Sequence, residues 1–219
     1  TESSSRKTKP RAPFTTSSLQ QDSSSRLRLS PSRTMALAQQ LFQGINLGNG
    51  EEGLITYMRT DSTALSNESL SEIKNYVNKS YGDNYYELRK YKTKSANAQE
   101  AHEAIRPTSI NRTPDSIKSF LDDDQFKLYD LIWKRTVASQ MSESVNKKTT
   151  IITSSENEKY KFKSDYDELI FDGFKKLFPE KESDKMPSIS EDDIVDLSKV
   201  DKEQKFTQHP PRYSEALSL

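Results

Sequence analysis

Tyr57 and Arg59 are the two residues of this chain whose types and spacing most directly suggest chemistry. They lie in a short apolar run, residues 53–62, which reads GLITYMRTDS. A tyrosine hydroxyl can act as a nucleophile and form a covalent intermediate, and a guanidinium can clamp a phosphate with a fixed fork of donors. Because positions i and i+2 of a strand share one face, both side chains could point at the same phosphate. The pair therefore indicates phosphoryl transfer on a polyanion.

Each member of the pair also has a more common role. Most tyrosines pack against other side chains with a satisfied hydroxyl, and Tyr57 is one of ten in the chain. A tyrosine is mostly protonated at neutral pH, so a nucleophilic Tyr57 needs a nearby cation, which Arg59 could supply. The alternative for Arg59 is a surface ion pair with Asp61. The residues alone leave both roles open.

A second segment with candidate functional residues, 98–108, reads AQEAHEAIRPT. His102, one of two histidines, could act as a general acid or base or contact a phosphate. The alternative is a histidine on a helix surface, paired with a carboxylate. Glu100 and Glu103 lack a third ligand, so we predict no metal site there. His209 precedes two prolines, and we assign it no role.

Two further segments could contact phosphates or bases. Residues 48–50, Gly-Asn-Gly, are not followed by the Gly-Lys-Ser/Thr of a phosphate-binding loop, so we predict a plain turn. Four tyrosines interleaved with basic residues could stack bases and hold the backbone of a single strand, although a solvated, lysine-rich loop is the alternative. These residues are Tyr81, Tyr85, Tyr86 and Tyr91, with Arg89, Lys90, Lys92 and Lys94.

The composition of the 219 residues favours small lobes over one large core. Charged residues make up 30% and hydrophobic residues 32%, and the mean hydropathy is −0.91. There are 33 basic and 33 acidic residues, so no global basic field argues for nucleic acid. Residues 1–33 are the exception, with seven basic residues against two acidic ones. Such an excess attracts phosphates, although a solvated basic arm is its more common meaning.

Several function classes are excluded by what the chain lacks. It has no cysteine, so it forms no disulfide and no thiolate zinc site, which is compatible with a reducing cytosol. No apolar run approaches the length of about 20 residues that spans a membrane, and the first residues lack the apolar stretch of a secretory signal. Because the chain starts at Thr1 and stops as a helix begins, we expect a piece of a larger protein.

Apolar residues at helical spacing, preceded by capping residues, predict most of the chain up to about residue 145 to be helical. Residues 54–58 suit a buried strand or turn instead. The predicted helices are 17–29, 32–45 with Ser32 as N-cap, one beginning at Ser66, 98–105, one beginning at Pro114, and 125–141.

The later part of the chain has the character of a sheet. Strands are predicted at 149–153 and at 160–163, with 169–171 continuing the sheet and 193–197 as a last strand. Residues 1–13 are typical of a linker or an extended edge, 180–193 of an acidic surface loop, and 213–216 of a new helix after two prolines. A helical block at 14–145 followed by a β block to about 208 indicates an α+β fold.

Four segments resemble, in the same order, the motifs of the type IA DNA topoisomerases. The run at 53–62 resembles their active-site tyrosine motif, and Met58 resembles the bacterial topoisomerase I branch, since the topoisomerase III branch usually has proline there. The four segments are 13–21 (PFTTSSLQQ), 53–62 (GLITYMRTDS), 98–107 (AQEAHEAIRP) and 210–216 (PPRYSEA).

The resemblance implies a mechanism and a set of site residues. Tyr57 would attack single-stranded DNA to give a 5′-phosphotyrosine, and Arg59 would contact the scissile phosphate. Another strand would pass through the break before religation without ATP, which relaxes negatively supercoiled DNA. His102 matches a family histidine that assists DNA binding. The further residues expected to bind DNA are Thr60, Asp61, Ser62 and Arg106.

The resemblance also implies which parts act together with this chain. The family's TOPRIM domain supplies the acidic Mg²⁺ site and completes catalysis, so we expect Mg²⁺ to bind there and not to these 219 residues. The expected partners are single-stranded or negatively supercoiled DNA and the TOPRIM and DNA-binding lobes of the same full-length protein, without a membrane, in the bacterial cytoplasm at the nucleoid. Alone, the fragment should be inactive.

By the same resemblance, the chain would form the arch of a toroid. A helical, winged-helix-like tyrosine domain at 17–145 would be inserted in a β-rich hinge domain made of 1–16 and 146–208, and 209–219 would begin the next DNA-binding lobe. The alternative function is a non-catalytic module that binds single-stranded nucleic acid. That alternative rests on the basic residues near the N-terminus and on the Tyr/Lys stretch at 81–94.

Overall fold

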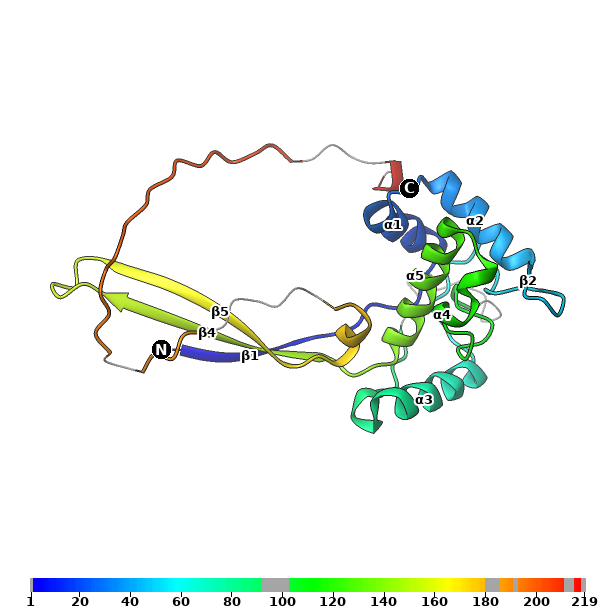
Figure 1. The fold of residues 1–219 in the computed structure, drawn as a ribbon, viewed down its shortest axis with the longest axis horizontal. Coiled ribbons are helices and arrows are strands. Elements are labelled where there is room, and N and C mark those ends of the chain that lie inside the picture. Colours follow the sequence, from blue (N-terminus) through cyan, green and yellow to red (C-terminus); the bar gives the residue numbers. More distant parts are fainter. Residues whose placement is uncertain (1, 92–102, 180–185, 191–192, 211–214, 218–219) are drawn as a thin grey trace.

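The chain folds into a helical block with a long antiparallel sheet extending from it (Figure 1). The computed structural model describes residues 2–91, 103–179, 186–190, 193–210 and 215–217. The predicted α+β class is confirmed. The helices of the block are α1 (Thr16–Leu27), α2 (Pro31–Gln43), α3 (Asn67–Tyr81), α4 (Pro114–Ile117) and α5 (Asp123–Ser139).

The sheet has three strands in the order β1-β4-β5, and both pairs are antiparallel. Its strands are β1 (Glu2–Thr8), β4 (Ser144–Ser154) and β5 (Lys161–Phe171). Strand β1 pairs with residues 144–150 of β4. In the sequence, the helical block at 16–139 is therefore inserted between two strands that are neighbours in the sheet. The extended edge expected near the N-terminus is therefore present as β1. The predicted domain boundaries and the winged-helix comparison stay predictions.

The helices begin where polar side chains can cap them, as the sequence suggests. Ser66 is the N-cap of α3, and its side chain accepts a hydrogen bond from the Ser69 amide. The predicted N-cap of α2, Ser32, is wrong. Ser30 caps that helix, because Pro31 takes the first helical position, where its missing N–H costs nothing.

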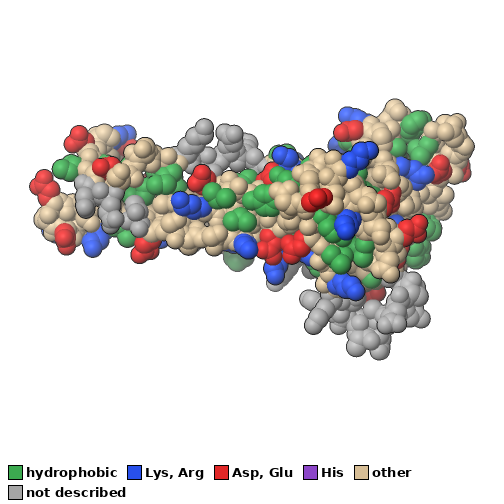
Figure 2. All heavy atoms as spheres, turned by 90° about the horizontal axis from the view of Figure 1, so that it is seen from below, with side chains coloured by type: hydrophobic (Ala, Val, Ile, Leu, Met, Phe, Trp, Pro, Cys, Tyr) green, Lys and Arg blue, Asp and Glu red, His purple; other side chains and the backbone are tan. Residues whose placement is uncertain are grey.

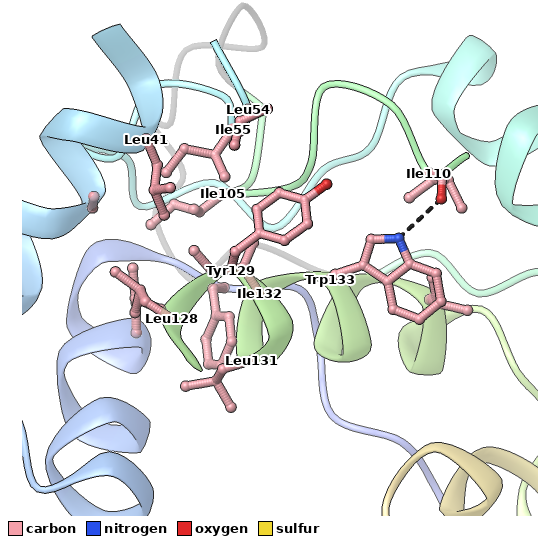
Figure 3. Close-up of a cluster of buried hydrophobic side chains, with 14 of the residues drawn as sticks. Leu41, Leu54, Ile55, Ile105, Ile110, Leu128, Tyr129, Leu131, Ile132 and Trp133 are labelled. Carbon is pink, nitrogen blue, oxygen red and sulfur yellow. Dashed lines mark hydrogen bonds between the residues drawn. The ribbon is translucent and has the colours of Figure 1, made fainter. Parts of the chain in front are cut away.

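The hydrophobic core lies in the helical block, and α5 runs through it (Figure 3). The predicted apolar face of α5 is buried at Tyr129, Ile132, Trp133 and Val137. The Trp133 indole donates a hydrogen bond to the Ile110 carbonyl over 2.9 Å, so its polar atom is satisfied inside the core. In the sheet strands, Ile151 alone among the described hydrophobic residues is buried. Stability is therefore concentrated in the block.

Two predicted elements are wrong for physical reasons. Of the predicted helix at 98–105, the described residues 103–105 are extended, because the amide of Ile105 bonds the Phe14 carbonyl at 2.8 Å and that of Ala104 bonds the Ala64 carbonyl at 2.9 Å. Residues 98–102 lie outside the described part. The predicted strand at 193–197 has no ladder partner in the described structure, and Ile194 is 97% exposed.

Other predictions needed smaller corrections. The pieces at 160–163 and 169–171 join in one strand, β5, which is mostly exposed and not half-buried, with Phe162 53% exposed. The turn predicted at 48–50 is present and joins β2 (Ile45–Asn46) to β3 (Glu51–Glu52). At the C-terminal end, the described residues form a short 3₁₀ helix, η4 (Glu215–Leu217), beside α1.

Charge is spread evenly over the face drawn in Figure 2, where basic and acidic side chains are interspersed on both the sheet and the block. This distribution agrees with the zero formal net charge. No helix in the described part of the chain is long and apolar enough to cross a membrane.

Candidate active site: the tyrosine loop

Residues 54–62, here called the tyrosine loop, form an extended segment whose first half is fixed by the chain at 104–108. The Thr56 amide donates to the Arg106 carbonyl over 2.9 Å. The Thr56 hydroxyl donates to the Ala104 carbonyl over 2.7 Å and accepts from the Arg106 amide over 3.0 Å. Only Ile55 forms a β-bridge here, with Pro107, so the expected strand is a single bridged segment. The backbone before Tyr57 is therefore held firmly.

The second half of the loop is held by Thr16, the first residue of α1. Its hydroxyl donates to the Met58 carbonyl over 2.8 Å and accepts from the Thr60 amide over 2.9 Å. Its own amide donates to the Thr60 carbonyl over 2.8 Å. The segment 13–21 thus supports the tyrosine loop from behind, although 42 residues separate Thr16 from Met58.

Burial alternates along the loop as an extended chain requires. Tyr57 is 50% exposed, Met58 is 1% exposed, Arg59 is exposed, and Thr60 is 8% exposed. The buried Met58 anchors the centre of the loop in the core. The same alternation leaves Tyr57 and Arg59 both open to solvent.

The Tyr57 ring is placed by the end of α2. It packs edge-on against Phe42, with ring centroids 5.3 Å apart and an angle of 64° between the planes. The Leu54 amide donates to the Leu41 carbonyl over 2.7 Å, and a Cβ on Gly53 would lie only 2.7 Å from the Phe42 carbonyl oxygen. Glycine at 53 therefore allows the loop to pass this close to α2. No described residue forms a hydrogen bond with the Tyr57 hydroxyl.

The Arg59 side chain is exposed. In the described part of the chain it forms no ion pair, so the alternative of a pair with Asp61 is not realised. Asp61 is itself exposed. An exposed guanidinium without a partner keeps all its donors available for a phosphate.

Thr60 and Ser62 shape the turn after Arg59. Both are buried, at 8% and 4% exposure. The Thr60 hydroxyl accepts from the Ser62 amide over 3.1 Å, and the Ser62 hydroxyl accepts from the Ala64 amide over 3.1 Å. In this conformation these hydroxyls support the loop and do not face solvent. The predicted contacts of Thr60, Asp61 and Ser62 with DNA stay untested.

Arg106 is already engaged, unlike Arg59. Its Nη2 lies 2.6 Å from Oε2 of Glu103, whose other oxygen accepts from the Ser66 amide over 2.7 Å. Burial acts to raise the pKa of Glu103, but the hydrogen bonds from Arg106 and Ser66 outweigh it and lower that pKa. Arg106 thus helps to hold the start of α3 against the tyrosine loop. A DNA contact by Arg106 stays a prediction, and His102 lies outside the described residues.

Comparison with known proteins identifies the family. A family model described as DNA topoisomerase matches residues 1–218. The chain belongs to the DNA topoisomerase family. DNA topoisomerase 1 of Rickettsia conorii is 46% identical over 216 residues, which cover 94% of this chain and 28% of that protein. DNA topoisomerase 1 of Helicobacter pylori is 42% identical over 215 residues, which cover 97% of this chain and 29% of that protein.

A solved structure agrees with this assignment to the DNA topoisomerases. Full-length topoisomerase I from Thermotoga maritima matches with a TM-score of 0.75 and 38% sequence identity, over 87% of this chain and 30% of that one. The chain therefore spans about three-tenths of the length of these topoisomerases.

The tyrosines of the stretch 81–94, which could stack bases, pack against the rest of this topoisomerase chain instead. The Tyr85 hydroxyl donates to Asp172 over 2.7 Å, and the Tyr91 hydroxyl donates to the Ser139 carbonyl over 2.9 Å. Burial raises the pKa of both Tyr81 and Tyr91 to about 12. These contacts do not favour a base-stacking surface. Lys92 and Lys94 lie outside the described residues.

Sequence reasoning missed the residues that position Tyr57. Thr16, Phe42 and Gly53 were not singled out, although Thr16 and Gly53 both lie in segments with family resemblance. Their roles are contacts between distant segments, which no local pattern predicts. The described residues also contain no group of three His, Cys, Asp or Glu side chains that could hold a metal ion.

Proposed function

We propose that this chain is the part of a type IA DNA topoisomerase that carries the DNA-cleaving tyrosine, Tyr57. The observation that carries the proposal is the half-exposed Tyr57, whose hydroxyl has no hydrogen-bond partner among the described residues. Two positions later lies Arg59, which is exposed and forms no ion pair with a described residue, and the loop that carries both is held at both halves. A nucleophile needs access to its substrate, and a phosphate clamp needs free donors. Membership of the DNA topoisomerase family indicates the substrate class.

In this proposal, the Tyr57 oxygen attacks the phosphorus of a phosphodiester in single-stranded DNA. The bond between phosphorus and the 3′ oxygen breaks, which leaves a 5′-phosphotyrosine and a free 3′ hydroxyl. The tyrosine releases its proton, and the leaving oxygen takes one up. Because the ester keeps the energy of the original bond, attack by the 3′ hydroxyl rejoins the strand without ATP.

Arg59 would act on the phosphate itself. Its guanidinium can hold a non-bridging oxygen and stabilise the charge that develops when Tyr57 attacks. The rigid backbone on both sides of Tyr57 keeps the nucleophile and the clamp in a fixed relation, which lowers the entropic cost of reaction. His102, Thr60, Asp61, Ser62 and Arg106 remain proposed DNA contacts.

The proposal assigns the metal to another part of the protein. The described residues contain no group of three His, Cys, Asp or Glu side chains that could hold a metal ion. We propose that Mg²⁺ binds in a TOPRIM domain of the same full-length protein and that this chain alone does not turn over. With that domain and the DNA-binding lobes, the whole enzyme would relax negatively supercoiled DNA in the bacterial cytoplasm by strand passage.

A reconstitution experiment tests the proposal. The chain is mixed with the TOPRIM-containing remainder of a DNA topoisomerase and a 3′-labelled single-stranded oligonucleotide, with Mg²⁺, and stopped with detergent. We expect a labelled protein–DNA adduct that Tyr57→Phe abolishes. Tyr160→Phe is the matched control, because Tyr160 is 57% exposed, and it should leave the adduct unchanged. An adduct that persists in Tyr57→Phe would overturn the proposal.

A further inference from the structure

Three arginines converge on one carboxylate at the side of α1. Asp22 lies within ion-pair distance of Arg135, Arg11 and Arg26, with nitrogen–oxygen distances of 3.2, 3.4 and 3.6 Å. Asp22 comes from the middle of α1, Arg26 from the next turn of that helix, Arg135 from α5, and Arg11 from the chain entering α1. One negative charge therefore faces three positive ones.

Asp22 and Arg135 form the buried pair of this cluster, and their charges balance each other. The Asp22 and Arg135 side chains are both 11% exposed, and Arg135 also donates to the Ala12 carbonyl over 2.6 Å. The Arg135 guanidinium lies 4.6 Å from the centre of the Phe14 ring. Asp22 and Arg135 thus neutralise each other inside the protein, and this pairing leaves the charges of the two outer arginines in excess.

The outer arginines remain accessible to solvent. The side chains of Arg11 and Arg26 are 69% and 49% exposed, and neither forms an ion pair with another described carboxylate. The pKa of Arg135 is lowered to about 10, first by burial, while Asp22 raises it and the charges of Arg11 and Arg26 lower it further. That repulsion agrees with an excess of positive charge at this place.

Three other arginines of the helical block each have a carboxylate of their own. Arg33 pairs with Asp124 at 2.9 Å, Arg106 pairs with Glu103 at 2.6 Å, and Arg112 pairs with Glu52. Arg11 and Arg26 differ because the one carboxylate that both contact, Asp22, is already paired with Arg135. An exposed guanidinium in excess favours a bound anion, and the fork of donors fits a phosphate best.

We propose that Arg11 and Arg26 form a binding site for the phosphodiester backbone of single-stranded DNA, separate from the tyrosine loop. This inference rests on the proposed function, which supplies DNA as the anion. Helix α1 connects the two places: Thr16 contacts the tyrosine loop, and Arg26 lies ten residues later, about 15 Å along the axis. A strand of a few nucleotides spans that length. The site would hold the DNA backbone without reading its sequence.

Salt-dependent DNA binding by the 219-residue chain tests the site. Fluorescence anisotropy with a labelled single-stranded oligonucleotide gives Kd at 50 and 200 mM salt for the wild type, Arg11→Gln/Arg26→Gln and Arg11→Lys/Arg26→Lys. Each lost phosphate contact reduces the salt slope by about 0.7. The glutamine variant should therefore show a ratio of the two Kd values about sevenfold smaller than that of the wild type. The lysine variant keeps the charge and should keep the slope.

Arg33→Gln is the matched control, because Arg33 is also 49% exposed but is balanced by Asp124, and it should bind like the wild type. The inference is overturned if the glutamine double variant keeps the wild-type salt slope, or if Arg33→Gln reduces that slope as much as the double variant does. It is also overturned if the wild-type chain binds no DNA at low salt. The cleavage test of Tyr57 does not use these variants. If the Arg11/Arg26 site fails its test while cleavage still depends on Tyr57, the proposed function therefore stays intact.

Discussion

At the scale of single residues, the tyrosine loop separates rigid backbone from free functional groups. Thr56, Met58 and Thr60 are hydrogen-bonded to other segments of the protein, while the side chains of Tyr57 and Arg59 face solvent. A fixed backbone limits the number of conformations that the nucleophile must give up before reaction. The loop therefore resembles a preorganised site, with its polar supports buried behind it.

Thr16→Val tests how far one hydroxyl supports this arrangement. Valine keeps the shape but removes the bonds to the Met58 carbonyl and the Thr60 amide, which then lie unsatisfied near the core. We expect the free energy of unfolding to fall by about 1–3 kcal/mol, measured by urea denaturation followed through Trp133 fluorescence. Thr153→Val is the control, since its hydroxyl has no hydrogen bond in the described structure, and it should change stability by less than about 0.5 kcal/mol.

A stability of Thr16→Val equal to that of the control would show that the loop does not depend on this hydroxyl. The two substitutions remove the same atom from the same residue type, so their difference isolates the hydrogen bonds. This comparison needs only the 219-residue chain.

At the scale of elements, residues 103–106 join the start of α3 to the tyrosine loop. Glu103 accepts from the Ser66 amide at the N-cap and from Arg106, whose backbone also bonds Thr56. A carboxylate near a helix N-terminus is favoured by the helix dipole as well as by these donors. The ionised form of Glu103 is therefore part of the link between helix and loop.

The lowered pKa of Glu103 predicts a pH dependence of stability. A carboxyl with a folded pKa below its ordinary value of 4.5 stabilises the protein above that pH, and the contribution is lost as the pH falls through the folded value. Glu103→Gln should therefore be less stable than the wild type at pH 7, with a smaller difference at pH 3, in urea denaturation series. Glu156→Gln, at an exposed position, should show no such trend. A constant difference for Glu103→Gln across this range would contradict the assignment.

Elements were predictable from the sequence where local rules decide them. The capping of α3 by Ser66 and the apolar face of α5 follow from side-chain type and spacing, and so does the selection of Tyr57 and Arg59. The extended conformation of Ile105 was not predictable, because its amide bonds Phe14, which is 91 residues away. The support from Thr16 was missed for the same reason. Local patterns select candidate residues, and tertiary contacts decide which of them are held together.

At the scale of the whole molecule, the sheet and the helical block differ in how they are stabilised. Buried apolar side chains are concentrated in the block, while Ile151 is the sheet's one buried hydrophobic residue among those described. Ladder hydrogen bonds of an exposed sheet open more readily than those of a packed helix. The sheet is therefore the part of this chain that can deform while the tyrosine loop, which lies in the block, keeps its shape.

Deletion of residues 1–8 should separate these two parts. It removes β1, which pairs with residues 144–150 of β4, but takes no side chain from the core around Trp133. We expect hydrogen exchange to become fast in β4, with protection in α5 within about tenfold of the wild type, as measured by mass spectrometry. The packed core should hold α5 because its buried face contacts α1 and α2. Equal loss of protection in α5 and β4 would mean that sheet and block unfold as one unit, and the tyrosine loop would then depend on the sheet.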